Sequence, residues 1–481
     1  MKKSSIRLAT QGGIQYTGGI PLRCARKGGC VENVYPPLVE SLARLVEEHD
    51  VIDPALYTKY DVKRGLRDSS GKGVLVGLTQ IGNVLGYEIQ DGKPVAVPGK
   101  LVYRGYDVED IIADVEESEM FGFEQVVYLL LFGELPNASQ LAEFDAILGE
   151  NRELPHNFVE DMILKSPSPN LMNKLAHSVI SSYVYDPDAE NPSIVNNLYQ
   201  SIQLIARFPA MVAYGYQAKR RHYDGKSMYL HNPLPNLSTS ENFLRLIRAD
   251  KIYDRAEAEI LDLAFVLHAE HGGGNNSSFT VHVVSSADTD TYSAIGAAVG
   301  SLKGRRHGGA NVRVMEMMAD IKSNVSDWSS EKEVGAYLRK ILRKEAFDRS
   351  GLVYGQGHAV YTISDPRATL LRDKAEKLAR VKHCEEEFGL YRTIERIFPD
   401  IFREEKGADK KICTNVDFYS GFVYSMLGIP PELYTPLFAI SRIAGWCAHR
   451  LEEIRSGRRI YRPAFKQIGE MRPFVRLADR R

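Results

Sequence analysis

The sequence predicts a mainly α fold with a minor N-terminal β element. Apolar residues recur at helical spacing from Val108 to the C-terminal region. Short β-like runs gather in one region, residues 74–106, and the strand–helix alternation of a nucleotide-binding sheet is missing. We therefore expect a large helical protein in which the sheet is a small appendage.

The N-terminal third contains the predicted non-helical elements. Pro36–Val51 is expected to form a short helix, because its leucines and valines fall on one face. The expected strands are Val74–Val76, Val84–Ile89, Val95–Val97 and Leu101–Tyr103. Asp91-Gly92 is a hairpin signal between the second and third of these runs.

Helical patterns fill the rest of the chain. The first, Val126–Phe132, stops at Gly133-Glu134-Leu135-Pro136, a sequence that ends helices. The others are Asn196–Tyr216, Ala256–His268, Ser293–Leu302, Val312–Ile321, Val334–Leu342 and Leu437–Ile454. A segment as apolar as Ser293–Leu302 belongs in the interior of a large helical protein.

Composition narrows the function. The 481 residues are 44% hydrophobic and 26% charged, and the formal net charge is −1, so the chain needs no general nucleic-acid surface. Apolar runs stay below the about 18 residues of a membrane span, so no membrane association is expected. The five cysteines are odd in number, which favours a reducing compartment, and Cys24 and Cys30 supply only half of a usual zinc site.

The first acidic residue is Glu32, after several lysines and arginines. This composition resembles a transit peptide, which leaves the mitochondrial matrix open, but glycines and Pro21 break any amphipathic helix. We expect an N-terminal arm and a cytoplasmic protein.

Three histidines stand in glycine-rich junctions at predicted helix boundaries. His271 precedes Gly272-Gly273-Gly274-Asn275, His307 precedes Gly308-Gly309, and His358 follows Gly355-Gln356-Gly357. Glycine lets a ligand or a second backbone approach closely. The start of a helix disfavours imidazolium, so these rings are expected to be neutral hydrogen-bond donors.

Two other interpretations of these histidines are open. Each histidine taken singly could cap or pack a turn. Metal binding by His268 and His271 is disfavoured, because their spacing is not the i, i+4 pair of a zinc helix and a third ligand is not evident. We expect no metal.

Asp417 and several arginines complete the candidate site. Asp417 precedes the apolar run Phe422–Leu427, and partial desolvation would make this carboxylate a better base, although it could also be a helix N-cap. Arg367, Arg442 and Arg462 are expected to hold carboxylates through their guanidinium forks. Together they suit a di- or tricarboxylate.

From Gly73 to Pro463 the chain resembles the citrate synthase family. It has His271, His307, His358, Arg367, Asp417, Arg442 and Arg462 in the family's order, with supporting stretches such as Leu101-Val-Tyr-Arg-Gly-Tyr. The resemblance implies condensation of acetyl-CoA with oxaloacetate and water to give citrate and CoA, without a cofactor.

The resemblance also implies a role for each residue. Asp417 removes a methyl proton, His307 stabilises the enol or enolate, and His358 polarises the ketone of oxaloacetate. The residues that bind oxaloacetate are His271, Arg367, Arg442 and Arg462, with Arg462 reaching in from the second subunit of a homodimer or higher homo-oligomer.

The family's two-domain form gives expected boundaries. Residues 1–72 form the arm and short helix, and 73–310 the first part of the large helical domain. A smaller helical domain, 311–427, is inserted and closes over the site, and 428–481 complete the large domain. Where the family has Gly-Pro-x-His at its second histidine, this chain has Gly304-Arg305-Arg306-His307, and where the family has a basic residue four positions after its third histidine, this chain has Thr362. Arg305, Arg306 and Lys410 are therefore the candidates for binding CoA.

Three alternatives stay open from the sequence. A 2-methylcitrate synthase would use propionyl-CoA on the same fold. A non-catalytic paralogue would bind acyl-CoA or a dicarboxylate without turnover. A metal-dependent hydrolase would use His268, His271 and His307.

Overall fold

The computed structural model describes residues 37–68, 73–91, 93–407, 411–457 and 459–480. The chain divides into two compact units, Met1–Val76 and Gly77–Arg481. In the first unit the predicted N-terminal helix is confirmed as α1 (Pro37–His49), and α2 (Pro54–Lys59) and a 3₁₀ turn (Arg64–Leu66) follow it. Pro36, Cys24 and Cys30 lie outside the described residues.

The predicted β element is a three-stranded antiparallel sheet in the order β1-β2-β3. Its strands are β1 (Gly82–Gln90), β2 (Lys93–Tyr103) and β3 (Tyr106–Asp107). The hairpin falls where Asp91-Gly92 predicts it, since Gln90 pairs with Lys93. Two of the predicted runs, Val95–Val97 and Leu101–Tyr103, are parts of the single strand β2. The predicted strand Val74–Val76 is wrong: a strand needs a pairing partner, and Leu75 is 85% exposed.

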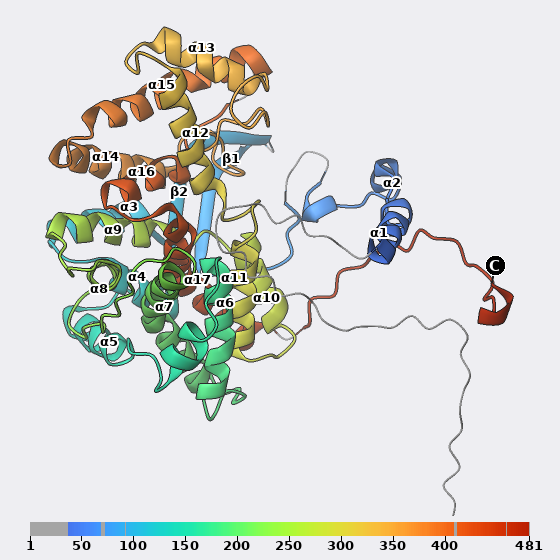
Figure 1. Cartoon of the computed structure of the whole chain (residues 1–481), viewed down its shortest axis with the longest axis horizontal. Helices are drawn as coiled ribbons and strands as arrows, with labels where there is room; N and C mark the ends of the chain where they lie inside the picture. Colours follow the sequence, from blue (N-terminus) through green and yellow to red (C-terminus); the bar gives the residue numbers. More distant parts are fainter. Residues whose placement is uncertain (1–36, 69–72, 92, 408–410, 458, 481) are drawn as a thin grey trace, which may run out of the picture. The chain divides into compact units, whose positions relative to one another are not determined.

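Helices make up most of the larger unit (Figure 1). They are α3 (Val108–Glu117), α4 (Phe123–Phe132), α5 (Ala138–Glu150), α6 (Leu171–Ser182), α7 (Ile194–His222), α8 (Thr239–Ile247), α9 (Arg255–His268), α10 (Asn276–Ser285), α11 (Thr291–Leu302), α12 (Ala310–Asn324), α13 (Glu331–Leu342), α14 (Pro366–Val381), α15 (Glu385–Lys406), α16 (Val416–Met426) and α17 (Tyr434–Ser456). Short 3₁₀ or π turns are Val159–Leu164, Tyr183–Tyr185, Pro431–Leu433 and Leu477–Asp479.

The mainly α prediction is confirmed, and all seven predicted helical segments lie inside helices. The helix predicted to stop at Gly133 is α4, and Gly133 adopts φ 85°, the left-handed cap that glycine tolerates best. Helix α17 lies at the centre of the core: it packs against α4, α7, α9, α10 and α11, and Trp446 at its middle is fully buried. Residues on α17 are therefore held from many sides.

Helices α12 to α16 form a second group. Helix α13 packs on α15, α14 on α16, and α12 on α16, and in Figure 1 the group gathers at one end of the larger unit. The predicted domain boundaries at 311 and 427 enclose almost the same helices, and they stay a prediction. No helix in the described part of the chain is long and apolar enough to cross a membrane.

Candidate active site

Six of the seven residues predicted to act on substrate line one cavity of about 160 Å³. They come from segments far apart in the sequence, namely loops, the starts of α14 and α16, and the interior of α17: His271, His307, His358, Arg367, Asp417 and Arg442. Other lining residues are His268, Asn275, Leu302, Gly308, Asn311, Asn415, Val416, Tyr424, Tyr434, Thr435 and Phe438. Charged and polar side chains make up most of this lining, and its apolar side chains are Leu302, Val416 and Phe438.

Two loops that carry candidate residues are fastened to each other. Gln356 pairs with Thr414 in an isolated antiparallel bridge, and Asn415 Nδ2 donates to the carbonyl of Gly357 at 2.7 Å. The same Asn415 caps α16, because its Oδ1 accepts the backbone N–H of Asp417 at 3.0 Å. These contacts bring the loop of His358 beside the first turn of α16, where Asp417 lies. The N-cap interpretation of Asp417 is therefore wrong.

The protonation of His358 is fixed by the backbone around it. Its Nδ1 accepts the N–H groups of Val360 and Tyr361, both at 3.1 Å. An atom that accepts two hydrogen bonds carries no proton, so the neutral ring bears its hydrogen on Nε2. Burial and the positive charge of Arg367 lower the pKa of His358 to about 4. The expected neutral imidazole is thus explained, although His358 lies in the loop before α14 rather than at a helix start.

His307 lies in the turn before α12, as the sequence predicts. Gly308 allows this turn, since a Cβ there would collide with the carbonyl oxygen of Leu302. His307 Nε2 is 3.2 Å from the hydroxyl of Ser277, which also accepts the indole N–H of Trp446 at 3.0 Å. Burial, with a contribution from Arg442, lowers the pKa of His307 to about 4.

Several buried polar atoms that line the cavity have no hydrogen-bond partner among the described residues. They include His271 Nε2 and both terminal nitrogens of Arg442, while Arg442 Nε donates to the carbonyl of His268 at 2.6 Å. Burial, the charge of Arg367 and the neighbouring His358 hold the pKa of His271 well below its usual range. Unpaired buried donors are costly, so this arrangement favours a bound acceptor such as a carboxylate.

Arg367 is held by an aspartate. Its Nε and Nη2 donate to the two carboxylate oxygens of Asp365 at 3.0 and 2.8 Å. Burial alone would lower the pKa of Arg367, but Asp365 more than offsets it and the pKa is raised. Asp365 also caps α14 by accepting the N–H of Arg367. The guanidinium is therefore fixed in direction, with Nη1 outside this bidentate pair.

Asp417 is buried and lies near the positive charges of Arg367 and Arg442. Burial raises the pKa of this carboxyl to about 6, although Arg367 pulls it the other way. A carboxylate with this pKa is ionised at neutral pH and is a stronger base than an exposed one. A base, neutral imidazole donors and two guanidinium groups thus share one cavity.

The family model for citrate synthase, C-terminal domain, matches residues 69–464. This chain belongs to the citrate synthase family. The citrate synthase of Haloferax volcanii is 35% identical over 414 residues, which cover 85% of this chain and 96% of that protein. The 2-methylcitrate synthase of Shewanella oneidensis is 33% identical, and the match covers 80% of this chain and 94% of that protein.

A solved structure resembles the fold as a whole. It is the ternary complex of citrate synthase from Thermoplasma acidophilum with carboxymethyl coenzyme A and oxaloacetate, at a TM-score of 0.70 and 25% identity, covering 87% of this chain and 99% of that one. Membership in the citrate synthase family makes this chain an acyltransferase.

Four residues predicted for the citrate synthase site do not lie in the cavity or cannot be placed. Among the described residues, Arg305 and Arg306 are exposed in the turn before His307, and Arg462 is exposed after α17 and does not line the cavity. Lys410 lies outside the described residues. Their roles therefore stay predictions.

Two residues that act on the citrate synthase site had no predicted role. Asp365 directs Arg367, and Ser277 contacts His307. A signal for Asp365 existed, since Asp before Pro-Arg at a helix start is a typical cap. For Ser277 the sequence has no comparable signal, because its contact depends on a turn thirty residues away.

Proposed function

We propose that this protein is a citrate synthase, which condenses acetyl-CoA with oxaloacetate and water to give citrate and CoA. The observation that supports this most is the pairing of a carboxyl whose pKa is raised to about 6, Asp417, with imidazoles whose pKa is lowered to about 4, His307 and His358. Removing a proton from a thioester methyl needs a base and an uncharged donor together in a dry site.

In the first step, the Asp417 carboxylate takes a proton from the methyl group of acetyl-CoA. The thioester oxygen gains negative charge as the enol or enolate forms, and His307 stabilises it. For this, Ser277 donates its hydroxyl proton to His307 Nε2, so that His307 Nδ1 carries the hydrogen that faces the substrate. A neutral donor matches the weakly acidic enol without adding a charge that would pull the proton away from Asp417.

In the second step, the methyl carbon attacks the ketone carbon of oxaloacetate. His358 donates from Nε2 to the ketone oxygen, which becomes the hydroxyl of citrate. The two carboxylates of oxaloacetate are held by Arg442, whose terminal nitrogens have no partner in the described part of the chain, and by His271 and Arg367. Water then cleaves the citryl thioester, giving the third carboxylate of citrate and the thiol of CoA. The proposed mechanism uses side chains alone and calls for no metal or redox cofactor.

A second candidate is the condensation of propionyl-CoA to 2-methylcitrate. It is favoured by the relative from Shewanella oneidensis, which bears that name at 33% identity. One additional methylene in an apolar pocket changes selectivity by only about 1–3 kcal/mol. The substrate therefore has to be decided by measurement.

The deciding experiment is thiol release, with oxaloacetate and either acetyl-CoA or propionyl-CoA. We expect a higher kcat/KM with acetyl-CoA, and citrate as the product. A higher kcat/KM with propionyl-CoA would assign the second function. An absence of CoA release with both substrates would overturn the proposal.

The remaining assignments are also part of the proposal. The assembly is a homodimer or larger, in which Arg462 of one subunit completes the site of another, and residues 311–427 close over oxaloacetate. Exposed apolar side chains after α17, Phe465 (94%) and Met471 (99%), support a partner surface. Arg305, Arg306 and Lys410 bind the phosphates of CoA. Three free thiols, Cys384, Cys413 and Cys447, support a cytoplasmic location.

A further inference from the structure

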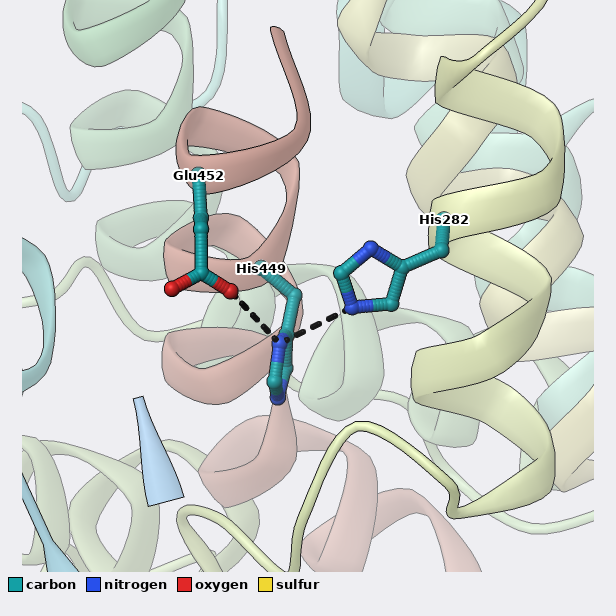
Figure 2. Close-up of side chains that lie close together, drawn as sticks. All are labelled: His282, His449 and Glu452. Atoms are coloured by element: carbon teal, nitrogen blue, oxygen red, sulfur yellow. Dashed lines mark hydrogen bonds and ion pairs between the residues drawn. The ribbon is translucent and has the colours of Figure 1, made fainter. Parts of the chain in front are cut away.

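Outside the catalytic cavity, two histidines and a glutamate converge between α10 and α17 (Figure 2). His282 belongs to α10, and His449 and Glu452 to α17. Each offers one ligand atom, and these atoms lie within 4.8 Å of one another. His282 and His449 are only 7% and 0% exposed, so this is an interior cluster and not a chance grouping on the surface.

Each imidazole in the cluster is held by a carboxylate on its outer side. His282 Nδ1 lies 2.7 Å from Glu453 Oε2, and His449 Nε2 lies 3.0 Å from Glu270 Oε1. The other nitrogens, His282 Nε2 and His449 Nδ1, face each other at 3.1 Å. Metal-bound histidines typically donate their second N–H to a carboxylate, which fixes the tautomer and orients the lone pair at the metal. Both rings are arranged in this way.

The distances suit a small divalent ion. Two bonds of about 2.0–2.1 Å at a tetrahedral angle would place the ligand atoms roughly 3.3 Å apart. The two ring nitrogens are 3.1 Å apart, and Glu452 Oε2 is 3.9 Å from His449 Nδ1, so a small shift of the glutamate completes the set. Glu452 Oε1 accepts the N–H of Gln80 at 2.7 Å, and its Oε2 is the oxygen that approaches His449 (Figure 2).

The charges around the two imidazoles and the space beside them also favour a bound divalent cation. Three carboxylates, Glu270, Glu452 and Glu453, surround the two imidazoles, and a divalent cation would offset more of this negative charge than one shared proton does. On one side the backbone of Gly273 approaches the rings: a Cβ there would lie 3.4 Å from both His282 Nε2 and His449 Cε1, an ordinary van der Waals distance. The space that a methyl group would fill is therefore open beside the two rings.

We propose that His282 Nε2, His449 Nδ1 and the Glu452 carboxylate bind one Zn²⁺, with water as the fourth ligand. Two imidazoles and a carboxylate in a tetrahedral arrangement are a donor set typical of this ion. The bound ion would tie α10 to α17, and His449 also contacts Glu270 in the loop between α9 and α10, which contains His271. The ion takes no part in the proposed condensation.

The first test uses the full-length protein, freed of metal with dipicolinic acid and then desalted. Titration with Zn²⁺ followed by calorimetry and metal analysis is expected to show one tightly bound ion per chain and a higher melting temperature. Co²⁺ added in place of Zn²⁺ is expected to give the intense visible absorption of a tetrahedral site. A metal-free protein that takes up neither ion would overturn the proposal.

Variants locate the ion. Glu452→Gln and His282→Gln are expected to lose the bound ion, and Glu453→Gln, which removes an outer carboxylate, to weaken affinity by about 10–100-fold. His222→Gln, an exposed histidine at the end of α7, is the matched control and should bind as the unchanged protein does. Circular dichroism identifies any variant that fails to fold, and the Co²⁺ spectrum of the unchanged protein decides the coordination without variants.

Equal uptake of Zn²⁺ by the unchanged protein and by folded Glu452→Gln and His282→Gln would place the ion elsewhere on the chain and overturn the proposal. Metal content is read without substrate, so a failure here is distinguishable from a failure of the proposed condensation, which thiol release measures.

Discussion

Burial moves the pKa of the Asp417 carboxyl and the pKa of the His307 and His358 imidazoles in opposite directions. It raises the pKa of Asp417 to about 6 and lowers the pKa of His307 and His358 to about 4. In both cases the low-dielectric surroundings penalise the charged form. Between these values and neutral pH, Asp417 becomes an anion while both rings stay uncharged, which is the combination that enolisation requires.

The first prediction concerns the pH dependence of kcat/KM for acetyl-CoA. Asp417 is active only when ionised, so activity is expected to fall as pH decreases through about 6. His358 and His307 do not cause this decrease in activity, since their rings stay neutral until the pH approaches about 4. Asp417→Asn is expected to lower kcat by about 10²–10⁴-fold, and its residual activity should no longer decrease as the pH falls through about 6. An unchanged profile would rule out Asp417 as the base.

The second prediction concerns the tautomer of His307. Ser277→Ala removes the hydroxyl that holds Nε2 as an acceptor, so the ring can place its proton on the wrong nitrogen. We expect kcat to fall roughly 10-fold or more, with little change in KM for oxaloacetate, because only the thioester step loses a donor. Ser278→Ala, at the neighbouring buried serine, is the matched control. Equal loss in both variants would indicate a packing defect instead.

At the residue scale, the sequence predicts which residues belong to the site better than it predicts how their side chains are oriented. Glycine-flanked histidines and an aspartate before an apolar run were enough to select His271, His307, His358 and Asp417. The sequence could not show that Asp365 occupies two nitrogens of Arg367, because a side chain's partner depends on the tertiary fold.

At the element scale, helix caps position the catalytic groups. Helix α16 begins where Asn415 accepts the N–H of Asp417, and α14 begins where Asp365 accepts the N–H of Arg367. Each cap also contacts a second segment, since Asn415 donates to Gly357 in the loop of His358, and Asp365 accepts the N–H of Val416, the first residue of α16. The contacts at these two helix starts therefore hold the residues of the site together.

The third prediction tests the contact between Asp365 and Arg367 at the start of α14. Asp365→Asn keeps a good capping side chain but removes the charge that pairs with the buried Arg367. Breaking a buried pair in this way costs about 3–5 kcal/mol, so the melting temperature should fall and KM for oxaloacetate should rise. Asp373→Asn, at an aspartate that is mostly exposed beside Arg372, should change neither. A stable variant with normal KM would show that the pair does not position Arg367.

Only some of the helices were predictable from the apolar residues of the sequence. Strongly apolar segments such as Val126–Phe132 and Ser293–Leu302 were found, and they are now parts of α4 and α11. Helix α14 was missed, because its mean hydropathy is low and charged residues dominate its exposed face. Helix α15 was missed as well, and it contains Pro399, a residue that argues against a helix interior. Packing against α13 and α16 decides these helices more than local sequence does.

At the scale of the whole molecule, one chain does not bring all the predicted binding residues together. Arg462 is exposed after α17, while the other six line the cavity. A second subunit that supplies Arg462 would complete the set. The fold class was predictable from the sequence. The number of chains that contribute to one site depends on the surfaces of the folded chains, and the spacing of apolar residues does not predict it.

The fourth prediction uses mixed dimers. Asp417→Asn and Arg462→Ala are each expected to be nearly inactive. If Arg462 acts on a second subunit, unfolding and refolding the two variants together produces hybrids in which one of the two sites carries neither change. Random pairing should then restore about a quarter of the unchanged activity. No recovery, after refolding controls that regain full activity, would place Arg462 within its own chain or outside the site.

The contact between Trp446 and Ser277 has a practical consequence. The chain has two tryptophans, and the fully buried indole of Trp446 donates to the serine that contacts His307. Its fluorescence emission should therefore change when a ligand reaches His307. With Trp328→Phe, Trp446 would be the single emitter, and the occupancy of the pocket could be followed in real time without any attached dye.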